Sequence, residues 1–246
     1  MFNFILTITV FLPAFAALLL LFLKDRKQVV QLSILSSIVT FVLTVALFIL
    51  YDKDKGGIQF IDHLNWIDSV NIKSSYLLGL DGLSAPLVLL TGLLGMVACM
   101  SSWRISHRYK EYFIWLLLLE TSVLGVFTSL DLLLFFIFFE FELIPMYMLI
   151  GIWGSGRKEY SATKFVIFTL AGGAFMLIGI LALFASDSVS TLAMVSIPEI
   201  GVQGIPDLIA GKDLIIPASF IFAFFFIAFA VKLPLWPLHN WLPDAH

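Results

Sequence analysis

Long runs of apolar residues, separated by short polar connections, are the dominant pattern of the chain. A run of about twenty apolar residues is long enough for a helix to cross the hydrocarbon core of a bilayer. A helix also satisfies its backbone hydrogen bonds internally, as a lipid surrounding requires. The pattern therefore predicts seven membrane-spanning helices, over residues 2–23, 28–50, 77–102, 112–129, 132–153, 160–185 and 214–232, the last with a broken continuation.

The composition supports this prediction. Hydrophobic residues make up 61% of the chain and charged residues 13%, and the mean hydropathy is +1.04. In soluble domains, charged residues make up roughly a quarter of the chain. The predicted fold class is therefore an all-α polytopic membrane protein, with the lipid bilayer as its surrounding and no nucleic acid as a partner. The single cysteine, Cys99, provides neither an intrachain disulfide nor a cysteine framework for metal, so any redox cofactor is expected in another subunit.

Basic residues gather on one side when the seven helices are threaded alternately through a bilayer. That side holds Lys24, Arg26, Lys27, Arg104, Arg108, Lys110, Arg157 and Lys158. Because basic loops mark the cytoplasmic face, the amino terminus is expected on the outer face. The long connections 51–76 and 186–213 are then external, and the second, which contains Pro and Gly turn signals, is expected to be an irregular loop.

Two glutamates interrupt the fifth apolar run. Glu140 lies near the expected bilayer midplane, where an ionised carboxylate costs about 2.5–3.5 kcal/mol on insertion scales. Such a residue faces protein, water or a partner charge; the alternative is a neutral acid that hydrogen-bonds a neighbouring helix. Glu142 would lie about 200° further around a regular helix, so the two need different partners. We expect Glu140 to face the interior, because Phe136 and Tyr147 would share its face.

A lysine closes the seventh apolar run, shortly before Pro234 and Pro237. Prolines remove backbone donors and clash with the preceding turn, so the helix is expected to break just after Lys232. Broken helices at membrane depth form ion sites in transporters. The alternative is a lysine that ends its span and extends to the interface. His239 titrates near neutral pH and could relay protons, although an interfacial aromatic belt would give the same residues.

Three other charged residues lie in or beside the apolar runs. Lys164 is close to the start of its span, where extension to the interface is the default interpretation. Glu120 lies near the middle of the fourth run and is, like Glu142, an accessory candidate for proton transfer. Asp131 is expected to cap the following helix, because an acid suits a helix amino terminus, and this role is structural.

Four motifs resemble a known family: GLDGLSAPLVLLTGLLG, SLDLLLFFIFFEFELIPMYMLIGIWG, EYSATKFVIFTLAGG and AFAVKLPLWPLHNWLPDAH. Together they are similar to the M subunit of proton-pumping NADH-quinone oxidoreductase, respiratory complex I, and to the D-type subunit of the related chloroplast and cyanobacterial NDH complex. By that resemblance, Glu140 corresponds to the essential glutamate of the fifth helix, Lys232 to the lysine of the broken seventh helix, and Lys164 to a lysine of the sixth.

The resemblance implies a function in proton translocation, as part of an NADH:quinone oxidoreductase of the bacterial inner membrane. Proton transfer would use Glu140, Lys232, Lys164 and His239. A Glu140–Lys232 pair would be the tunable element if the two groups are close, a distance that the sequence does not give. NADH, FMN, iron–sulfur clusters and quinone are expected in partner subunits of the membrane and redox arms, and no cofactor in this chain. The sequence contains no GxGxxG or GxxxxGK[ST] motif that would bind a nucleotide.

Family members are longer and contain a second, inverted repeat, so the chain is expected to be the amino-terminal part of such a subunit. Residues 1–246 would form one membrane domain, with peripheral helices in 1–110 and the first part of the proton-translocating repeat in 111–246. Two other hypotheses remain at this point. One is a subunit of a multisubunit Mrp-type Na+/H+ antiporter, which needs no NADH chemistry; the other is a scaffold without a transport role.

Overall fold

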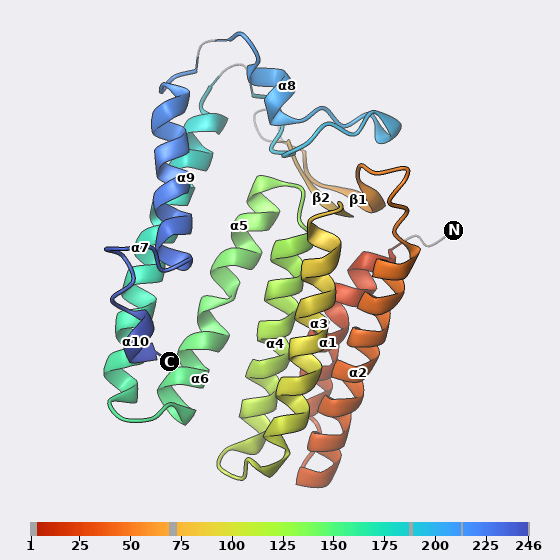
Figure 1. Ribbon diagram of the computed structural model, residues 1–246, viewed down its shortest axis with the longest axis vertical. Helices are drawn as coiled ribbons and strands as arrows, with labels where there is room; N and C mark the ends of the chain where they lie inside the picture. The colour runs from red at the N-terminus through yellow and green to blue at the C-terminus, as the bar shows by residue number, and fades with distance from the viewer. Residues whose placement is uncertain (1–3, 69–72, 187–188, 213, 246) are drawn as a thin grey trace. The chain divides into compact units, whose positions relative to one another are not determined.

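A computed structural model of the chain describes residues 4–68, 73–186, 189–212 and 214–245 (Figure 1). The chain divides into two compact units, Met1–Asp62 with Leu78–Ser129, and His63–Leu77 with Leu130–His246. In this division, residues 111–128 belong to the same unit as the preceding helices. The expected division into peripheral helices, 1–110, and a proton-translocating repeat, 111–246, refers to function and stays a prediction.

The structure is mostly helical, as a membrane protein of this composition requires. Within the described residues, five helical stretches are long and apolar enough to cross a bilayer: Arg26–Leu50, Ser84–Arg104, Tyr109–Thr128, Leu132–Trp153 and Lys158–Phe184. Two further apolar helices, Ile5–Leu20 and Ala218–Lys232, are shorter. The class of helical integral membrane protein is therefore confirmed, and the number of seven spans stays a prediction.

The first unit is a bundle of α1 (Ile5–Leu20), α2 (Arg26–Leu50), α3 (Ser84–Ser101) and α4 (Tyr109–Thr128), drawn in red to yellow-green in Figure 1. Its interior contains both apolar and small polar side chains. Ser33, Ser37, Thr40 and Thr44 follow one buried face of α2, at spacings of three or four residues. The Ser33 hydroxyl donates to the Val29 carbonyl of its own helix at 2.8 Å, which partly compensates its burial.

A two-stranded sheet lies between α2 and α3 in the sequence, formed by β1 (Gln59–Asp68) and β2 (Lys73–Leu80). The all-α prediction is wrong for this segment, and the helix expected to begin at residue 77 begins at Ser84. Asp81 explains the switch from strand to helix: its carboxylate accepts from the amides of Leu83 at 3.0 Å and Ser84 at 2.7 Å. Although burial raises the pKa of Asp81, these hydrogen bonds outweigh it and hold the pKa below its ordinary value.

Asp62 of β1 caps the first helix from more than fifty positions away in sequence. Its carboxylate accepts from the Phe4 and Thr7 amides and from the Thr7 hydroxyl, each at 2.8 Å. The amino-terminal amides of a helix have no partners within the helix, so this buried aspartate satisfies two of them. The hairpin thereby fixes the start of α1.

At its other end, the first unit brings basic residues of separate connections together. Arg26 donates to the carbonyls of Trp103 and Ile105 at 3.2 Å. Lys110 donates to the Leu21 carbonyl at 2.5 Å. The short connections before α2 and before α4 are therefore neighbours, as expected if both lie on the basic side of a membrane.

The second unit is built around α7 (Lys158–Phe184), which packs against α6 (Leu143–Trp153) and α9 (Ala218–Lys232). Figure 1 shows α7 and α9 running side by side. A glycine allows this close approach, because a Cβ at Gly172 would lie 3.1 Å from Cβ of Val231. Short helices complete the unit: α8 (Ile205–Ile209) and α10 (Leu242–Ala245).

The predicted span 132–153 is interrupted at Glu142, which separates α5 (Leu132–Phe141) from α6. Pro145 explains the interruption, because it has no amide hydrogen to donate to the Phe141 carbonyl four residues earlier. The chain continues in a helical direction, with the Met146 amide donating to the Glu142 carbonyl at 3.3 Å. Glu142 therefore lies at a helix irregularity, and Glu140 lies just before it in α5.

The connection between α7 and α9 pairs with the start of α5. The Leu132 amide donates to the Leu192 carbonyl at 2.9 Å, and the Met194 amide donates to the Leu130 carbonyl at 2.8 Å. In its described residues, 189–212, the connection has a short 3-10 helix η2 (Pro198–Ile200), α8 and otherwise irregular backbone. The irregular loop predicted for this region is confirmed there.

Candidate functional site

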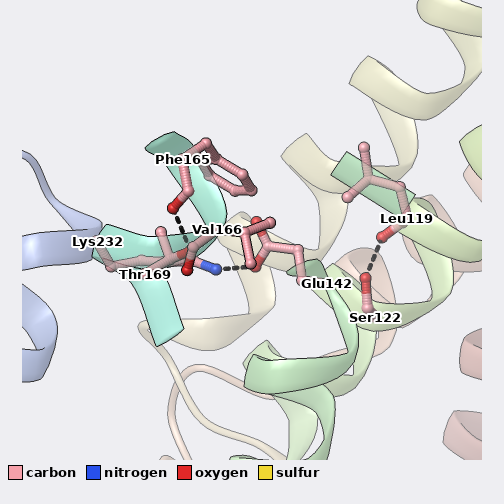
Figure 2. A network of polar contacts seen from close by, with 7 residues as sticks. All are labelled: Leu119, Ser122, Glu142, Phe165, Val166, Thr169 and Lys232. Carbon is pink, nitrogen blue, oxygen red and sulfur yellow. Dashed lines mark hydrogen bonds and ion pairs between the residues drawn. The ribbon is translucent and has the colours of Figure 1, made fainter. Parts of the chain in front are cut away.

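Lys232 forms an ion pair with Glu142 inside the second unit. Its Nζ lies 3.1 Å from Oε2 of Glu142, and each side chain is about one-fifth exposed. Figure 2 shows the ammonium of Lys232, at the end of α9, pointing at the carboxylate of Glu142 at the α5–α6 junction. The contact lacks hydrogen-bond geometry, since Nζ has no hydrogen-bond partner. The pair therefore depends mainly on charge attraction, and either side chain can be displaced without breaking a directional bond.

This pairing differs from the expected one, in which Glu140 was the partner of Lys232. The expectation assumed a regular helix, on which the two glutamates face different directions. Glu142, which lies at the interruption between α5 and α6, is the glutamate that contacts the lysine. In this conformation Glu142 forms the direct ion pair with Lys232, whereas the sequence left the Glu140–Lys232 distance open.

Glu140 is held against the backbone of α7. A Cβ at Gly173 would lie only 1.7 Å from Oε1 of Glu140 and 2.6 Å from its Cδ. Oε1 is buried and has no hydrogen-bond partner. The positive charge of Lys232 nevertheless acts on this carboxyl group, which places both glutamates in the field of one lysine. The site thus contains one cation and two carboxyl groups, of which one is directly paired.

An aromatic ring completes the surroundings of the lysine. Nζ of Lys232 lies 4.7 Å from the centroid of the Phe139 ring, and Phe139 in turn packs edge-to-face on Phe229 of α9. A cation over an aromatic face is attracted by the negative ring face, by about 0.5–2 kcal/mol depending on exposure. The lysine is thereby kept near the glutamates even when its ion pair opens.

The backbone just after Lys232 is irregular, yet its carbonyls find partners within the chain. Pro234 cannot donate to the Ala230 carbonyl, which instead accepts from the Leu235 amide at 2.8 Å. The Val231 carbonyl accepts from the indole Nε1 of Trp241 at 2.9 Å. Trp241 is buried against Phe165 of α7, with ring centroids 5.3 Å apart. The segment after α9 therefore folds back onto α7 and fixes the position of Lys232.

The other two predicted proton-transfer residues lie in the same unit. Lys164 of α7 forms an ion pair with Asp244, with 2.5 Å between Nζ and Oδ2. Nδ1 of His239 is buried and has no hydrogen-bond partner among the described residues. The structure thus pairs Lys164 with an acid that the sequence patterns did not single out, and it leaves one nitrogen of His239 open to accept or donate a proton.

The accessory candidates divide between the units. Asp131 caps α5 as predicted, since its carboxylate accepts from the amides of Leu133 at 3.0 Å and Leu134 at 3.2 Å. It also accepts from the Ser74 hydroxyl at 2.8 Å and the Ser75 amide at 3.1 Å, so it joins β2 to α5 as well. Glu120 belongs to the first unit, where it is buried on α4. It is therefore not part of the Lys232 cluster within the second unit.

Three residues of the site carried no recognisable signal in the sequence. Gly173 makes room for the Glu140 carboxyl group, a role that depends on the packing of α5 against α7. Trp241 and Asp244 lie in the proline-containing segment after α9. Their roles depend on the chain folding back after α9, which a local pattern does not encode. Among the described residues, no group of three or more His, Cys, Asp or Glu side chains converges in a way that suits a metal ion.

Part of the chain is similar to a known protein family. Residues 129–246 match the family model described as NADH:quinone oxidoreductase/Mrp antiporter, transmembrane. These residues are similar to the proteins of this family. They contain α5, α6, α7 and α9, and hence Glu140, Glu142, Lys164 and Lys232. The cluster of one lysine and two glutamates therefore lies within the part of the chain that matches the family model.

Relatives extend the similarity to nearly the whole chain. NADH-quinone oxidoreductase subunit M of Rickettsia felis is 35% identical over 250 residues, which cover 98% of this chain and 48% of the relative. A NAD(P)H-quinone oxidoreductase chain 4 of Synechococcus elongatus is 39% identical over 245 residues, covering 98% of this chain and 43% of the relative. The chain thus spans less than half the length of these family relatives.

Two solved structures have a similar fold. A chain of respiratory complex I from Thermus thermophilus with bound NADH superposes with a TM-score of 0.80 and 30% identity, covering 98% of this chain and 46% of that chain. A chain of an archaeal membrane-bound sulfane sulfur reductase superposes with a TM-score of 0.71 and covers 97% of this chain and 35% of that chain, but at 19% identity. The second likeness concerns the fold alone.

Proposed function

We propose that the chain forms part of a membrane-arm subunit of an NADH:quinone oxidoreductase and moves protons across the membrane while partner subunits transfer electrons. The observation that carries this proposal is the Lys232–Glu142 ion pair, with Glu140 beside it, among apolar helices. Charged residues at membrane depth are costly and mark ion and proton pathways. The names of the family relatives supply the coupling to NADH and quinone.

Lys232 would act by exchanging between two carboxylates. While it pairs with Glu142, the Glu140 carboxyl group lies against Gly173 without a hydrogen bond to Oε1, and an anion there is poorly compensated. Glu140 then takes up a proton. When Lys232 moves toward Glu140, its charge favours the carboxylate and the proton leaves. A conformational signal from a redox partner needs only to shift the lysine between two neighbouring acids.

The remaining residues would connect this switch to proton donors and acceptors. His239 follows the end of α9, and its Nδ1 has no hydrogen-bond partner among the described residues, so it could accept or donate a proton in a relay. Lys164 forms an ion pair with Asp244, a second acid–base pair in the same unit. In this proposal, Glu120 and Asp131 stand outside the direct proton path.

The proposal includes a membrane topology. Seven spans would cross the bilayer, counting α1 and α9 with the five longer stretches, and the seventh would be the first half of a helix broken after Lys232. The shared basic end of the first unit would face the cytoplasm, which places the amino terminus outside a bacterial inner membrane. Other membrane-arm subunits, lipid and protons would be the partners. FMN, iron–sulfur clusters and quinone would bind in those partners.

The deciding experiment uses the full-length protein that contains this chain. A tag on it should copurify flavin and iron–sulfur subunits from native membranes, and the complex in vesicles should acidify one side when NADH is oxidised. Glu140→Gln should abolish the proton movement that depends on this subunit. Copurification with small antiporter subunits, and sodium–proton exchange without NADH, would instead establish the Mrp-type alternative, which the names of the relatives support less well.

A further inference from the structure

A second buried acid lies in the first unit, outside the proposed lysine switch. Glu120 of α4 is only 6% exposed. Both of its carboxyl oxygens are buried, and neither has a hydrogen-bond partner among the described residues. Buried polar groups in native proteins are normally paired, so an orphaned carboxyl group calls for a physical explanation.

Glu120 forms part of the wall of a pocket between α3 and α4. The cavity has a volume of about 220 Å³ and is lined, beside Glu120, chiefly by Leu94, Gly95, Ala98, Leu116 and Leu119. The carboxyl group lies against bare backbone, because a Cβ at Gly95 would be 2.5 Å from its Cδ and Oε1. Leu94 on the rim is 58% exposed, so the pocket lies at the surface of this unit.

Among the described helices of the first unit, no cation near the pocket compensates a negative charge on Glu120. Helix α1 has no ionisable side chain, and the only one in α3 is Cys99. The ionisable residues of α2 lie in its first turn, and those of α4 other than Glu120 lie at its start. They are Arg26 and Lys27 in α2, and Tyr109, Lys110, Glu111 and Tyr112 in α4. Lys110 is ten positions from Glu120, or about 15 Å along the helix axis. A carboxylate here would have neither an ion-pair partner nor a hydrogen-bond donor, so the neutral acid is favoured.

We propose that Glu120 is a proton-binding carboxyl group of the first unit, reached from the surface through the pocket between α3 and α4. The pocket has about the volume that seven water molecules occupy in liquid water. Because its walls are apolar, small apolar molecules can enter it. The inference goes beyond the proposed function and does not depend on it, because it uses only groups of the first unit.

A lipid-soluble carbodiimide tests the proposal, because it reacts with a protonated carboxyl group in an apolar surrounding. The carboxyl proton moves to one carbodiimide nitrogen while the carboxylate oxygen bonds the central carbon, and an acyl shift to the nitrogen then gives a stable N-acylurea. The reaction is an addition without a leaving group. Dicyclohexylcarbodiimide applied at neutral pH to native membranes that contain the full-length protein should leave this adduct on Glu120, detected by mass spectrometry of the digested protein. An unmodified Glu120 beside modified carboxyl groups elsewhere in the chain would overturn the proposal.

Two substitutions on α3 test the route through the pocket. Ala98→Phe fills the cavity and should lower the adduct yield at Glu120 by roughly tenfold, since the reagent loses its place beside the acid. Val97→Phe adds the same ring at an exposed neighbouring position that does not line the pocket, and should leave the yield unchanged. Equal yields in both variants would exclude this pocket as the access route. Labelling of the wild-type protein still decides whether Glu120 binds a proton, even if a variant does not assemble.

Discussion

Nζ of Lys232 lies 3.1 Å from Oε2 of Glu142, while the Glu140 carboxyl group is held against Gly173. Two acids, two positions apart, therefore have different relations to one cation. Glu142 lies at the interruption between α5 and α6, three residues before Pro145, which has no amide hydrogen to donate. The expected roles of the two glutamates in proton transfer follow from this difference.

The first prediction compares Glu140→Gln with Glu142→Gln in the assembled complex. Glu140→Gln removes the group that takes up the proton and should lower NADH-driven proton pumping by about tenfold or more. Glu142→Gln removes only one partner of a partly exposed ion pair. Such a pair is worth up to about 1 kcal/mol, so the loss should be about fivefold or less. Pumping is measured in vesicles as protons moved per NADH oxidised.

The double variant Glu140→Gln/Glu142→Gln serves as the control. If both residues act through Lys232, the double variant should pump no worse than Glu140→Gln alone, because coupled residues are not additive. A larger loss at Glu142 than at Glu140 would mean that the directly paired acid carries the proton. Normal pumping in both single variants would rule out the exchange of Lys232 between them.

The second prediction concerns Gly173→Ala. The added Cβ would fall 1.7 Å from Oε1 of Glu140, so the carboxyl group must move away from α7. Proton pumping should fall by about tenfold, although no charge has changed, because a buried group displaced by an ångström loses its geometry. Pumping and the amount of assembled subunit are measured together, which separates displacement from misfolding.

A matched substitution and a rescue make this test specific. Gly151→Ala adds the same methyl group where it meets only the Cβ of Ala162 at 3.6 Å, an ordinary contact, so pumping should stay normal. Shortening the acid in Gly173→Ala/Glu140→Asp should restore part of the activity, because it withdraws the carboxyl group from the new methyl. No recovery, together with a loss in Gly151→Ala, would point to general helix damage.

The sequence patterns predicted most of the helical architecture. Spans of about twenty apolar residues correspond to α2, α4 and α7 within a few positions. The hairpin was missed because most of its residues lie in a segment interpreted as a connection and the end of β2 lies in a predicted span, and because its position depends on distant partners. Asp62 shows this dependence, since it caps α1 from β1. A capping aspartate is recognisable in sequence only when its helix follows directly, as with Asp131 and α5.

The sequence identified which charged residues form the site but not which of them contact one another. Buried charge in an apolar run is a strong signal, and it identified Glu140, Glu142 and Lys232. Their pairing depends on how the backbone departs from regular helix at Pro145 and Pro234, and periodicity assumes regular helices. The role of Trp241 depends on a chain reversal after α9, so it could not be inferred from the local pattern.

The third prediction uses the two tryptophans of that reversal. Trp241→Phe keeps the ring against Phe165 but removes the indole donor to the Val231 carbonyl. A buried carbonyl without a partner costs about 1–3 kcal/mol, so amide hydrogen exchange at the end of α9 should accelerate and pumping should fall. Trp236→Phe is the control, because Trp236 is 84% exposed and should tolerate the change. Equal effects of the two substitutions would show that the donor to Val231 is not what fixes Lys232.

The last prediction concerns Asp131, which lies outside the membrane spans. Burial raises its pKa above the ordinary 3.8, although hydrogen bonds led by that from Ser74 lower it. The folded state therefore binds this proton more tightly than the unfolded state. The stability it contributes is full below the ordinary pKa and is lost as pH rises through the raised pKa.

Replacement by asparagine keeps an acceptor for the helix cap but removes the titration. Asp131→Asn should thus flatten this part of the pH dependence of thermal unfolding and leave stability at neutral pH unchanged or higher. Asp131→Ala should lose about 1 kcal/mol from the cap, and about 1–3 kcal/mol more from the unpaired Ser75 amide. Unfolding of the detergent-solubilised protein, followed from mildly acidic to mildly alkaline pH, measures both. A steeper pH dependence in Asp131→Asn than in the wild type would contradict the sign, because it would mean that the folded state holds this proton less tightly than the unfolded state.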